Sequence, residues 1–404
     1  MHPNLRSFKQ LVRHLWVILI VSNFLACATQ SDQVSSRAYK GHESDLDANN
    51  FVSVYPDSLG TRLDDCQTCH KGDTFTYPRD EDIRSVYKNS CDYCHLIEHP
   101  ADNFIEPQPK NYTDTLNPYG AAYLAAGRTK QALKDIAEDD SDSDEYGNQV
   151  EITDLKYPGD PDSRPGQEVA PLINMTMADL KALGAHTQFL LANSHKQEYD
   201  NYSVYTGVKI KDLLAGAGVD SQDANIEGIT IIAPDGYMKD FSMDDVNNAF
   251  AKSLYYANLD NAGLGTECGF VTYPDNLPGG LSDGGEIPDE QWLQLAYQRD
   301  ELPMQPCSLD ITSGKIEGEG PFRIIVPQSI PGSPDRGSTY SPTECNDGWD
   351  YDDSKDHNAG AMVRGVTAIR INPLPAGYED FDHKNGGWAF IDDKSIIIYG
   401  YGIS

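Results

Sequence analysis

Two short motifs of cysteine and histidine carry the clearest chemistry in this sequence of 404 residues. Residues 66–70 read Cys-Gln-Thr-Cys-His, and residues 91–95 read Cys-Asp-Tyr-Cys-His. Two thiols one helical turn apart reach the two vinyl groups of a porphyrin, and the next residue, His, then lies over the iron. The motifs therefore predict two covalently bound c-type haems. The thioether residues would be Cys66, Cys69, Cys91 and Cys94, with His70 and His95 as proximal iron ligands.

The second axial ligand of each iron can be narrowed by counting side chains. Residues 28–174 contain four His and no Met, and two of these His belong to the haem motifs. His99 follows the second proximal His by one helical turn, so it would reach the other haem rather than its own. His42 is the other candidate in this segment, and His357 and His383 are weaker candidates from outside it. Since Met ligation raises a haem potential, its absence predicts bis-His haems of low potential.

An acidic loop at residues 140–151, with the sequence DSDSDEYGNQVE, has the spacing of a calcium-binding loop. Oxygen donors fall at positions 1, 3, 5, 7, 9 and 12 of the loop, and Ca²⁺ takes about six to eight hard oxygen ligands. Glu145 departs from the pattern, because Gly normally makes the sharp turn at its position. The loop resembles those of dockerins and thrombospondin type 3 repeats, and the alternative is a solvated acidic linker. The candidate ligands are Asp140, Asp142, Asp144, the Tyr146 carbonyl, Asn148 and Glu151.

The charge balance limits the classes of partner. The chain has 31 Lys and Arg against 63 Asp and Glu, which gives a formal net charge of −32 at pH 7. Binding to nucleic acid requires basic side chains that contact phosphates, so this composition excludes it. Docking on anionic lipid by charge is excluded for the same reason. An acidic surface suits contact with basic partners, and we expect redox partner proteins or other cytochromes.

The N-terminus resembles an export signal with a lipoprotein cleavage site. Three basic residues precede a short apolar stretch at residues 15–21, which is too short to span a bilayer. The sequence Leu-Ala-Cys at 25–27 predicts cleavage after Ala26 and acylation of Cys27, and ordinary cleavage nearby is the alternative. Ala28 stands where inner-membrane lipoproteins commonly have Asp. We therefore expect a periplasmic or outer-membrane lipoprotein, anchored only by its lipid.

Three of the eight cysteines are not used by these features. Export to an oxidising compartment favours one disulfide among Cys268, Cys307 and Cys345. The odd number leaves one cysteine of this set outside the bond, and the sequence does not select the pair.

Shifts in composition divide the chain into five segments. Residues 1–26 form the expected signal peptide, and residues 27–50 form a flexible tether rich in Ser and Asp. Residues 51–137 form a small diheme cytochrome c domain, in which porphyrins supply much of the core. Residues 138–167 hold the acidic loop and a linker rich in Pro and Gly. Residues 168–404 form a β-rich domain, so the predicted fold class is α+β with several domains.

Local signals predict elements in both domains. Asn117 and Pro118 are a helix start, and the helix from Tyr119 to about Ala137 is weakened by Gly127. Short strands dominate the C-terminal region. There we expect helices after Thr176 and Ser242 and over 208–214, a turn at Asp235 and Gly236, and strands at 229–233, 322–327, 366–371 and 395–399.

The C-terminal region resembles a known enzyme domain. Tyr-Thr-Gly-Val at 205–208, Ala-Pro-Asp-Gly-Tyr at 233–237 and Gly-Glu-Gly-Pro at 318–321 are similar to motifs of the molybdopterin-binding domain of sulfite-oxidase-type enzymes. The resemblance covers most of residues 170–375 and implies a sulfite-oxidase-like fold. That family binds molybdenum through a Cys upstream of Thr-Gly-Val. Residues 190–195 contain no Cys, so molybdopterin is not expected as a cofactor.

The order of features along the whole chain resembles the diheme cytochrome lipoproteins named for a Gly-Glu-Gly-Pro motif. The lipoprotein start, two haem motifs, acidic loop and residues 318–321 occur in that order. This resemblance implies an architecture and an electron-transfer role rather than a substrate. In the Gly-Glu-Gly-Pro motif itself we expect a turn before a strand.

These features favour an exported diheme lipoprotein that transfers electrons and docks a partner through its C-terminal domain. One alternative is a molybdenum oxidoreductase that passes electrons to its own haems. A diheme peroxidase would separate its haem motifs more widely along the chain. A calcium-stabilised surface scaffold, in which haem is structural, is a further alternative.

Overall fold

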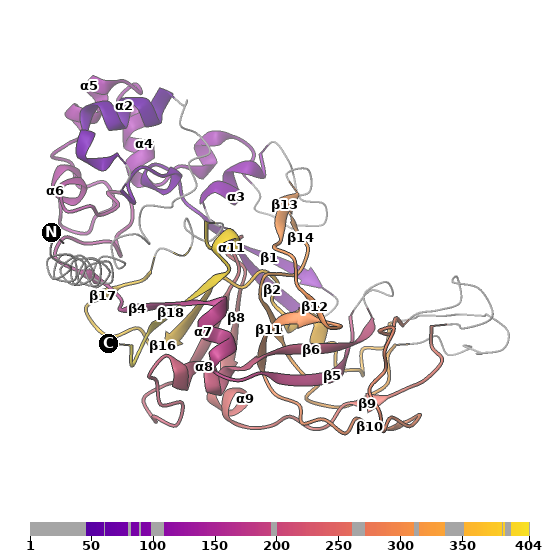
Figure 1. Cartoon of the computed structure of the whole chain (residues 1–404). Coiled ribbons are helices and arrows are strands. Elements are labelled where there is room, and N and C mark those ends of the chain that lie inside the picture. The colour runs from indigo at the N-terminus through magenta and orange to yellow at the C-terminus, as the bar shows by residue number, and fades with distance from the viewer. Residues whose placement is uncertain are drawn as a thin grey trace, which may run out of the picture.

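The computed structural model describes residues 46–59, 61–79, 82–88, 90–97, 109–194, 200–260, 271–310, 315–335, 351–381, 383 and 389–403. These residues form a helical region from the N-terminal part of the chain and a larger β-rich region from the C-terminal part (Figure 1). A mixed α+β architecture is therefore confirmed. The predictions that lie outside the described residues are the signal peptide, Cys27, His42, His99, Cys268 and Cys345.

The helical region consists of short helices around an aromatic core. The ring of Phe51 lies 5.1 Å from that of Tyr55 and meets Tyr119 edge-on at 6.3 Å. Tyr119, Leu133 and Tyr157 are fully buried, and the Tyr55 hydroxyl donates to the Leu133 carbonyl. Aromatic residues thus supply large contact areas to a region with few aliphatic side chains. Its helices are α2 (Leu46–Val54), η2 (Pro56–Ser58), η3 (Cys66–Thr68), α3 (Ser90–His95), η4 (Tyr112–Thr115), α4 (Pro118–Ala125), α5 (Lys130–Asp135) and α6 (Asn148–Thr153).

α4 and α5 occupy the stretch where the sequence predicts one helix ending near residue 137. The predicted start at Asn117 is confirmed, but the predicted continuity is wrong. Gly127 has a φ of 99° and Arg128 a φ of 54°. The backbone therefore leaves the helical conformation at these two residues, which separate α4 from α5. Thr129 then caps the second helix with its side chain.

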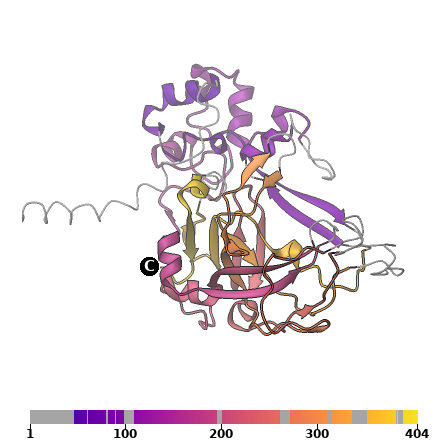
Figure 2. The same cartoon turned by 45° about the vertical axis from the view of Figure 1, so that its right-hand side comes forward.

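An antiparallel hairpin connects the two haem motifs, and the sequence did not predict it. β1 (Asp73–Arg79) pairs with β2 (Asp82–Lys88) along its whole length. Figure 2 shows the hairpin extending from the helices towards the β-rich region. Because a hairpin returns the chain to its starting point, α3 after β2 comes into contact with η3 before β1.

Two five-stranded sheets form the β-rich region. The first has the order β4-β18-β16-β7-β8 and is antiparallel except for the parallel pair β16–β18. The second has the order β12-β11-β6-β5, and β15 also pairs with β11. Three smaller pairs are β3–β17, β9–β10 and β13–β14. The strands are β3 (Glu168–Val169), β4 (Leu172–Thr176), β5 (His186–Ala192), β6 (Asn201–Lys209), β7 (Gly228–Ile232), β8 (Met238–Ser242), β9 (Leu254–Tyr255), β10 (Gly285–Glu286), β11 (Gln294–Arg299), β12 (Leu302–Pro303), β13 (Ser308–Asp310), β14 (Lys315–Glu317), β15 (Arg323–Ile325), β16 (Ala368–Asn372), β17 (Tyr378–Glu379) and β18 (Ser395–Gly400).

The first sheet is apolar on both faces. Side chains alternate along a strand, so Ile396 and Ile398 of β18 join the main core shared with the second sheet. Ile397 and Tyr399 point to the opposite face and pack with Phe390. Strands covered on both faces read as continuous apolar runs, and the runs that predicted β7 and β18 are confirmed.

The short helices of the β-rich region begin at their capping signals. The predicted starts at Thr176 and Ser242 are confirmed, since each side chain caps a helix. The helix predicted from 208 begins later, because Val208 lies in β6 and pairs with Leu295 of β11. The helices are α7 (Met177–Ala182), α8 (Ile210–Gly216), α9 (Met243–Asn247), η7 (Asn358–Ala361) and α11 (Ala389–Asp393).

A buried group of charges joins the two regions, and we call Arg62, Lys156 and Glu379 the interdomain latch. The carboxylate of Glu379 lies 2.7 Å from Arg62 Nη2 and 2.6 Å from Lys156 Nζ. Arg62 also stacks over the Tyr157 ring, 4.3 Å from its centroid. Burial opposes the ionisation of Glu379, but its hydrogen bonds and charge contacts with Arg62 and Lys156 outweigh burial and lower its pKa.

Candidate haem and metal sites

The first haem motif forms one tight turn, η3. Asp65 caps this turn by accepting a hydrogen bond from the Gln67 N–H at 3.1 Å. The N–H groups of Cys69 and His70 both donate to the Cys66 carbonyl, at 3.1 and 2.8 Å. Both cysteines are half-buried and neither is in a disulfide. The turn therefore gives the residue spacing that two thioether bonds and a proximal His require.

Asn117 holds this turn against the start of α4. Its Nδ2 donates to the carbonyls of Gln67 and Thr68, at 2.8 and 3.2 Å, and its N–H donates to the Cys69 carbonyl at 3.1 Å. Gly120 lies so close that a side chain there would overlap the Cys69 carbonyl oxygen. The sequence predicted Asn117 only as a helix cap. Its hydrogen bonds to the motif join residues far apart in the chain, and no local signal announces them.

The orientation of the first proximal His is set by a chain of two hydrogen bonds. His70 Nδ1 lies 2.8 Å from Thr115 Oγ1, and the Thr115 hydroxyl donates its proton to the Tyr112 carbonyl at 2.9 Å. Since a hydroxyl has one proton, Thr115 Oγ1 accepts from His70 and the ring carries its proton on Nδ1. The lone pair of a neutral ring in this tautomer is on Nε2, which is the nitrogen that can bind iron.

The second haem motif lies in α3, which contacts both η3 and η4. Cys94 is half-buried and is not in a disulfide, while the side chains of Cys91 and His95 lie outside the description. Tyr93 is almost fully buried in this helix. Burial and the nearby charge of Asp73 raise the pKa of Tyr93 to about 12. The two motifs therefore belong to one packed unit of the helical region.

The two weaker candidates for iron ligation lie in the β-rich region. His357 Nε2 is 2.8 Å from Asp335 Oδ2, and its ring stacks on Tyr351. His383 is buried, and its Nδ1 contacts the Phe381 carbonyl and the Tyr399 hydroxyl. Each ring is thus engaged by groups of its own region.

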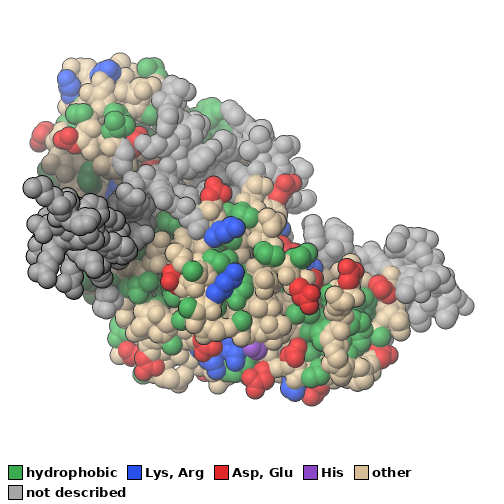
Figure 3. All heavy atoms as spheres, viewed as in Figure 1, with side chains coloured by type: hydrophobic (Ala, Val, Ile, Leu, Met, Phe, Trp, Pro, Cys, Tyr) green, Lys and Arg blue, Asp and Glu red, His purple; other side chains and the backbone are tan. Residues whose placement is uncertain are grey.

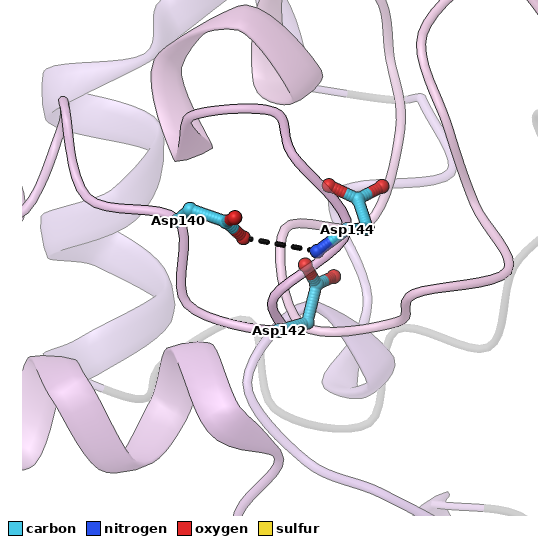
Figure 4. Close-up of side chains that lie close together, drawn as sticks. All are labelled: Asp140, Asp142 and Asp144. Carbon is cyan, nitrogen blue, oxygen red and sulfur yellow. Dashed lines mark hydrogen bonds between the residues drawn. The ribbon is translucent and has the colours of Figure 1, made fainter.

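The acidic loop folds back on itself around its first carboxylate. Asp140 accepts backbone hydrogen bonds from Ser143 at 2.7 Å, Asp144 at 3.2 Å and Glu145 at 3.1 Å. Figure 4 shows the carboxylates of Asp140, Asp142 and Asp144 lying close together. One oxygen from each of these three lies within 4.8 Å of the others, a separation that one metal ion could bridge.

Glu151 of α6 is a fourth carboxylate that the charges of these three aspartates affect. It is fully buried, and neither of its oxygens has a hydrogen-bond partner. Burial and the charges of Asp142, Asp144 and Asp140 raise the pKa of Glu151 to about 8. The same two causes, burial and the neighbouring aspartates, raise the pKa of Asp142 to about 6. The four carboxylates therefore repel one another strongly when no cation is bound.

Among the other loop positions, Asn148 and Tyr146 are compatible with their predicted roles as ligands, whereas Glu145 has a strained backbone conformation. Asn148 is fully buried, and its Nδ2 donates to the Ile136 carbonyl at 2.6 Å, which fixes the orientation of the amide. The Tyr146 side chain is partly exposed, as a residue that offers only its carbonyl can be. Glu145 adopts a φ of 83°, the left-handed conformation that favours Gly. Glu145 thus makes the sharp turn at the position where calcium-binding loops usually have Gly.

The Gly-Glu-Gly-Pro motif at 318–321 lies in a network of charges that the sequence did not predict. Glu319 pairs with Arg299 and lies 3.0 Å from Arg323 Nη1. Burial opposes ionisation of Glu319, but both guanidinium groups outweigh it and lower its pKa. The Cys307 N–H donates to the Gly320 carbonyl, and burial raises the pKa of the Cys307 thiol to about 11. These contacts fit a motif that orders the turn before β15.

On the side drawn in Figure 3, acidic side chains are scattered over both regions. Within the described part of the chain, no helix has the length and apolar character to cross a membrane.

No family model matches this chain, and neither a curated protein nor a solved structure matches it at a significant level. Its function is therefore inferred from its own residues and their geometry.

Proposed function

We propose that this protein is an exported diheme c-type cytochrome lipoprotein that transfers electrons in the periplasm or at the cell surface. The observation that supports this most is the contact of His70 Nδ1 with Thr115 Oγ1, at 2.8 Å. Because the Thr115 hydroxyl donates to the Tyr112 carbonyl, it accepts the Nδ1 proton of this ring, and a neutral ring then has its lone pair on Nε2, the nitrogen proposed to bind iron. Cys66 and Cys69 lie beside this ring in the η3 turn, where the Cys69 N–H donates to the Cys66 carbonyl at 3.1 Å.

The residues that would hold the first haem are Cys66 and Cys69 as thioether partners and His70 as proximal ligand. Bound haem supplies one-electron chemistry at its iron. The protein contributes a fixed attachment turn, a positioned imidazole and a contact between η3 and α3. Because the two motifs are in contact, electrons can pass between two haems in one unit. For the second haem the proposed residues are Cys91, Cys94 and His95, with His99 and His42 as the proposed distal ligands.

We assign this role to a diheme domain over residues 51–137, followed by the calcium-type loop at 138–167. Residues 168–404 would form a sulfite-oxidase-like domain that docks a redox partner. The latch supports a fixed relation between the two parts, because its carboxylate is in the second and its Arg62 is in the first.

The alternative is an oxidoreductase in which a molybdopterin domain passes electrons to the haems. Cys307 is the only cysteine among the described residues of the β-rich region, and burial disfavours its thiolate. Residues 190–195, where the resemblance would place the metal-binding Cys, contain no Cys, and this favours the electron-transfer role.

Purification of the full chain from a strain that matures cytochromes tests the proposal. We expect two haems per chain that survive acid and acetone, a low-spin spectrum without a Met–iron band, and no molybdenum. The reduced protein should exchange electrons with small cytochromes. A stoichiometric content of molybdenum would replace this proposal with the oxidoreductase.

A further inference from the structure

The acidic loop contains buried oxygens that the protein itself does not satisfy. Both carboxylate oxygens of Glu151 and of Asp142 are without a hydrogen-bond partner, as is one oxygen each of Asp144 and Asn148. Glu151 and Asn148 are fully buried. Native proteins pair nearly all buried polar groups, because an uncompensated buried carboxylate is costly. These side chains therefore point to a ligand.

Among the described residues, no buried basic side chain pairs with the carboxylates of this cluster. In the part of the chain that the structure describes, the only ion pair to these carboxylates joins Asp144 to Arg164, at a distance of 4.0 Å. The Arg164 side chain is 48% exposed, so water screens much of its charge. The Nζ of Lys156, a residue just after α6, is directed to Glu379 instead.

We propose that a Ca²⁺ ion binds at Asp140, Asp142, Asp144 and Glu151 and acts as a clamp that orders both the interdomain latch and the first haem motif. All available donors are hard oxygens, with no thiol or imidazole among them, and this set favours Ca²⁺ over transition metals. The flexible coordination of Ca²⁺ suits an irregular loop better than the strict octahedron of Mg²⁺. The site itself does not depend on haem, but its effect on the first haem rests on the proposed function.

The latch is connected to the ion through the residues just after α6. The Lys156 N–H donates to the carbonyl of Glu151 at 2.8 Å, so the ligand residue directly supports the backbone of a latch residue. The side chain of Lys156 then pairs with Glu379 in the β-rich region. An ion that fixes Glu151 therefore fixes the position from which Lys156 reaches across.

The residues that follow Lys156 connect this segment to the first haem motif. The Tyr157 hydroxyl donates to the Arg62 carbonyl at 3.1 Å, and Arg62 stacks on the Tyr157 ring. Gly159 lies so close to Asn117 that a side chain there would overlap the amide. Asn117 in turn holds the carbonyls of the first haem motif. Residues 151–159 thus join the ion, the latch and the haem turn.

Calcium titration of the purified, haem-loaded full chain after treatment with a chelator tests this inference. We expect one Ca²⁺ per chain by calorimetry, and protection of amides in residues 154–160 from hydrogen exchange on addition of Ca²⁺. Glu151→Gln should weaken Ca²⁺ binding on the order of a hundredfold, since it removes a carboxylate ligand. If that variant does not fold, Asp142→Asn provides the same measurement at a less buried position.

Glu145→Gln is the matched control. It makes the same change of charge in the same loop, but its side chain is exposed, so its Ca²⁺ affinity should stay within about threefold of the wild type. Absence of binding at millimolar Ca²⁺, or an equal loss in both variants, would overturn the site. Binding that leaves the exchange of residues 154–160 unchanged would overturn the clamp. Neither result alters the haem content, so failure of this inference is distinct from failure of the proposed function.

Discussion

The helical region and the β-rich region are stabilised in different ways. The β-rich region has two sheets that enclose a continuous aliphatic core, in which Leu295 and Ile398 are fully buried. The helical region has short helices around a few tyrosines, and beside them a cluster of carboxylates with unsatisfied oxygens. The first kind of core needs only side chains, whereas on the proposed function the second would be completed by bound haem and Ca²⁺. The candidate sites accordingly lie in the region with the weaker core.

We expect the largest loss of stability from a substitution of Glu379, which pairs with Arg62 and Lys156 and so joins the two regions. Glu379→Gln removes the carboxylate between Arg62 and Lys156 and leaves both cations buried without it. We expect a loss of about 3 kcal/mol in the free energy of unfolding, measured by denaturant titration. Glu168→Gln, an exposed position on β3, the strand beside Glu379, is the control and should cost little. Equal losses in the two variants would contradict the role of the latch.

The lowered pKa of Glu379 determines how its contribution to stability changes with pH. The pKa of Glu379 is lowered in the folded state, so its contribution to stability is fully present above its unfolded pKa of about 4.3. This contribution is lost as the pH falls through the folded pKa. The wild type should therefore lose its advantage over Glu379→Gln on acidification. A gap between the two proteins that widens at low pH would be the wrong sign.

A smaller effect is expected at the contact between α4 and the first haem motif. Asn117→Ala removes a helix cap and also the donors to Gln67 and Thr68. We expect a loss of about 2 kcal/mol in thermal unfolding, together with poorer attachment of the first haem. Thr129→Ala removes only the cap of α5 and should cost about 1 kcal/mol with normal haem content. Identical behaviour of the two variants would show that Asn117 is only a cap.

One substitution in the acidic loop should increase the stability of the protein. Glu145→Gly relieves a residue held at a φ of 83°, and we expect a gain of about 0.5 kcal/mol, measured in the presence of Ca²⁺. Ser141→Gly in the same loop is the control, because its φ is not positive: the substitution relieves no backbone strain, adds chain entropy and removes a buried hydroxyl, so it should not stabilise the protein. Destabilisation by Glu145→Gly would mean that its side chain has a role the geometry does not show.

The finest effect concerns the potential of the first haem. Thr115→Val removes the acceptor of the His70 Nδ1 proton, and a less basic proximal ring should raise the reduction potential of that haem. Thr115→Ser keeps the acceptor and should restore the wild-type value. A redox titration resolves the two haems, and a potential that is unchanged or lower in the valine variant would contradict the assigned tautomer.

Sequence patterns predicted the local features of this protein and missed those that depend on distant residues. The caps at Asn117, Thr176 and Ser242 are read from a few neighbouring residues, and so are the apolar strands. The break at Gly127 was underestimated, since the effect of one Gly in a helix depends on the conformation of the residues after it.

The candidate site shows the same limit. The spacing of Cys66, Cys69 and His70 could be read directly, as could the donors of the acidic loop. The Thr115 acceptor and the contact of Asn117 with the haem turn depend on chain reversals of about 50 residues, which no local pattern encodes. The burial of Glu151 likewise results from tertiary packing rather than from its place in the loop.

Covalent haem staining of cysteine variants made in a strain that matures cytochromes tests the two haem sites most directly. Replacing both cysteines of one motif by Ala, Cys66 with Cys69 or Cys91 with Cys94, removes both thioether residues of one haem. We predict that each of these variants loses covalent attachment at one haem and that the variant lacking all four cysteines shows no covalent haem after treatment with acid and acetone. Two covalent haems in the variant lacking all four cysteines would contradict the assignment of both motifs as haem attachment sites.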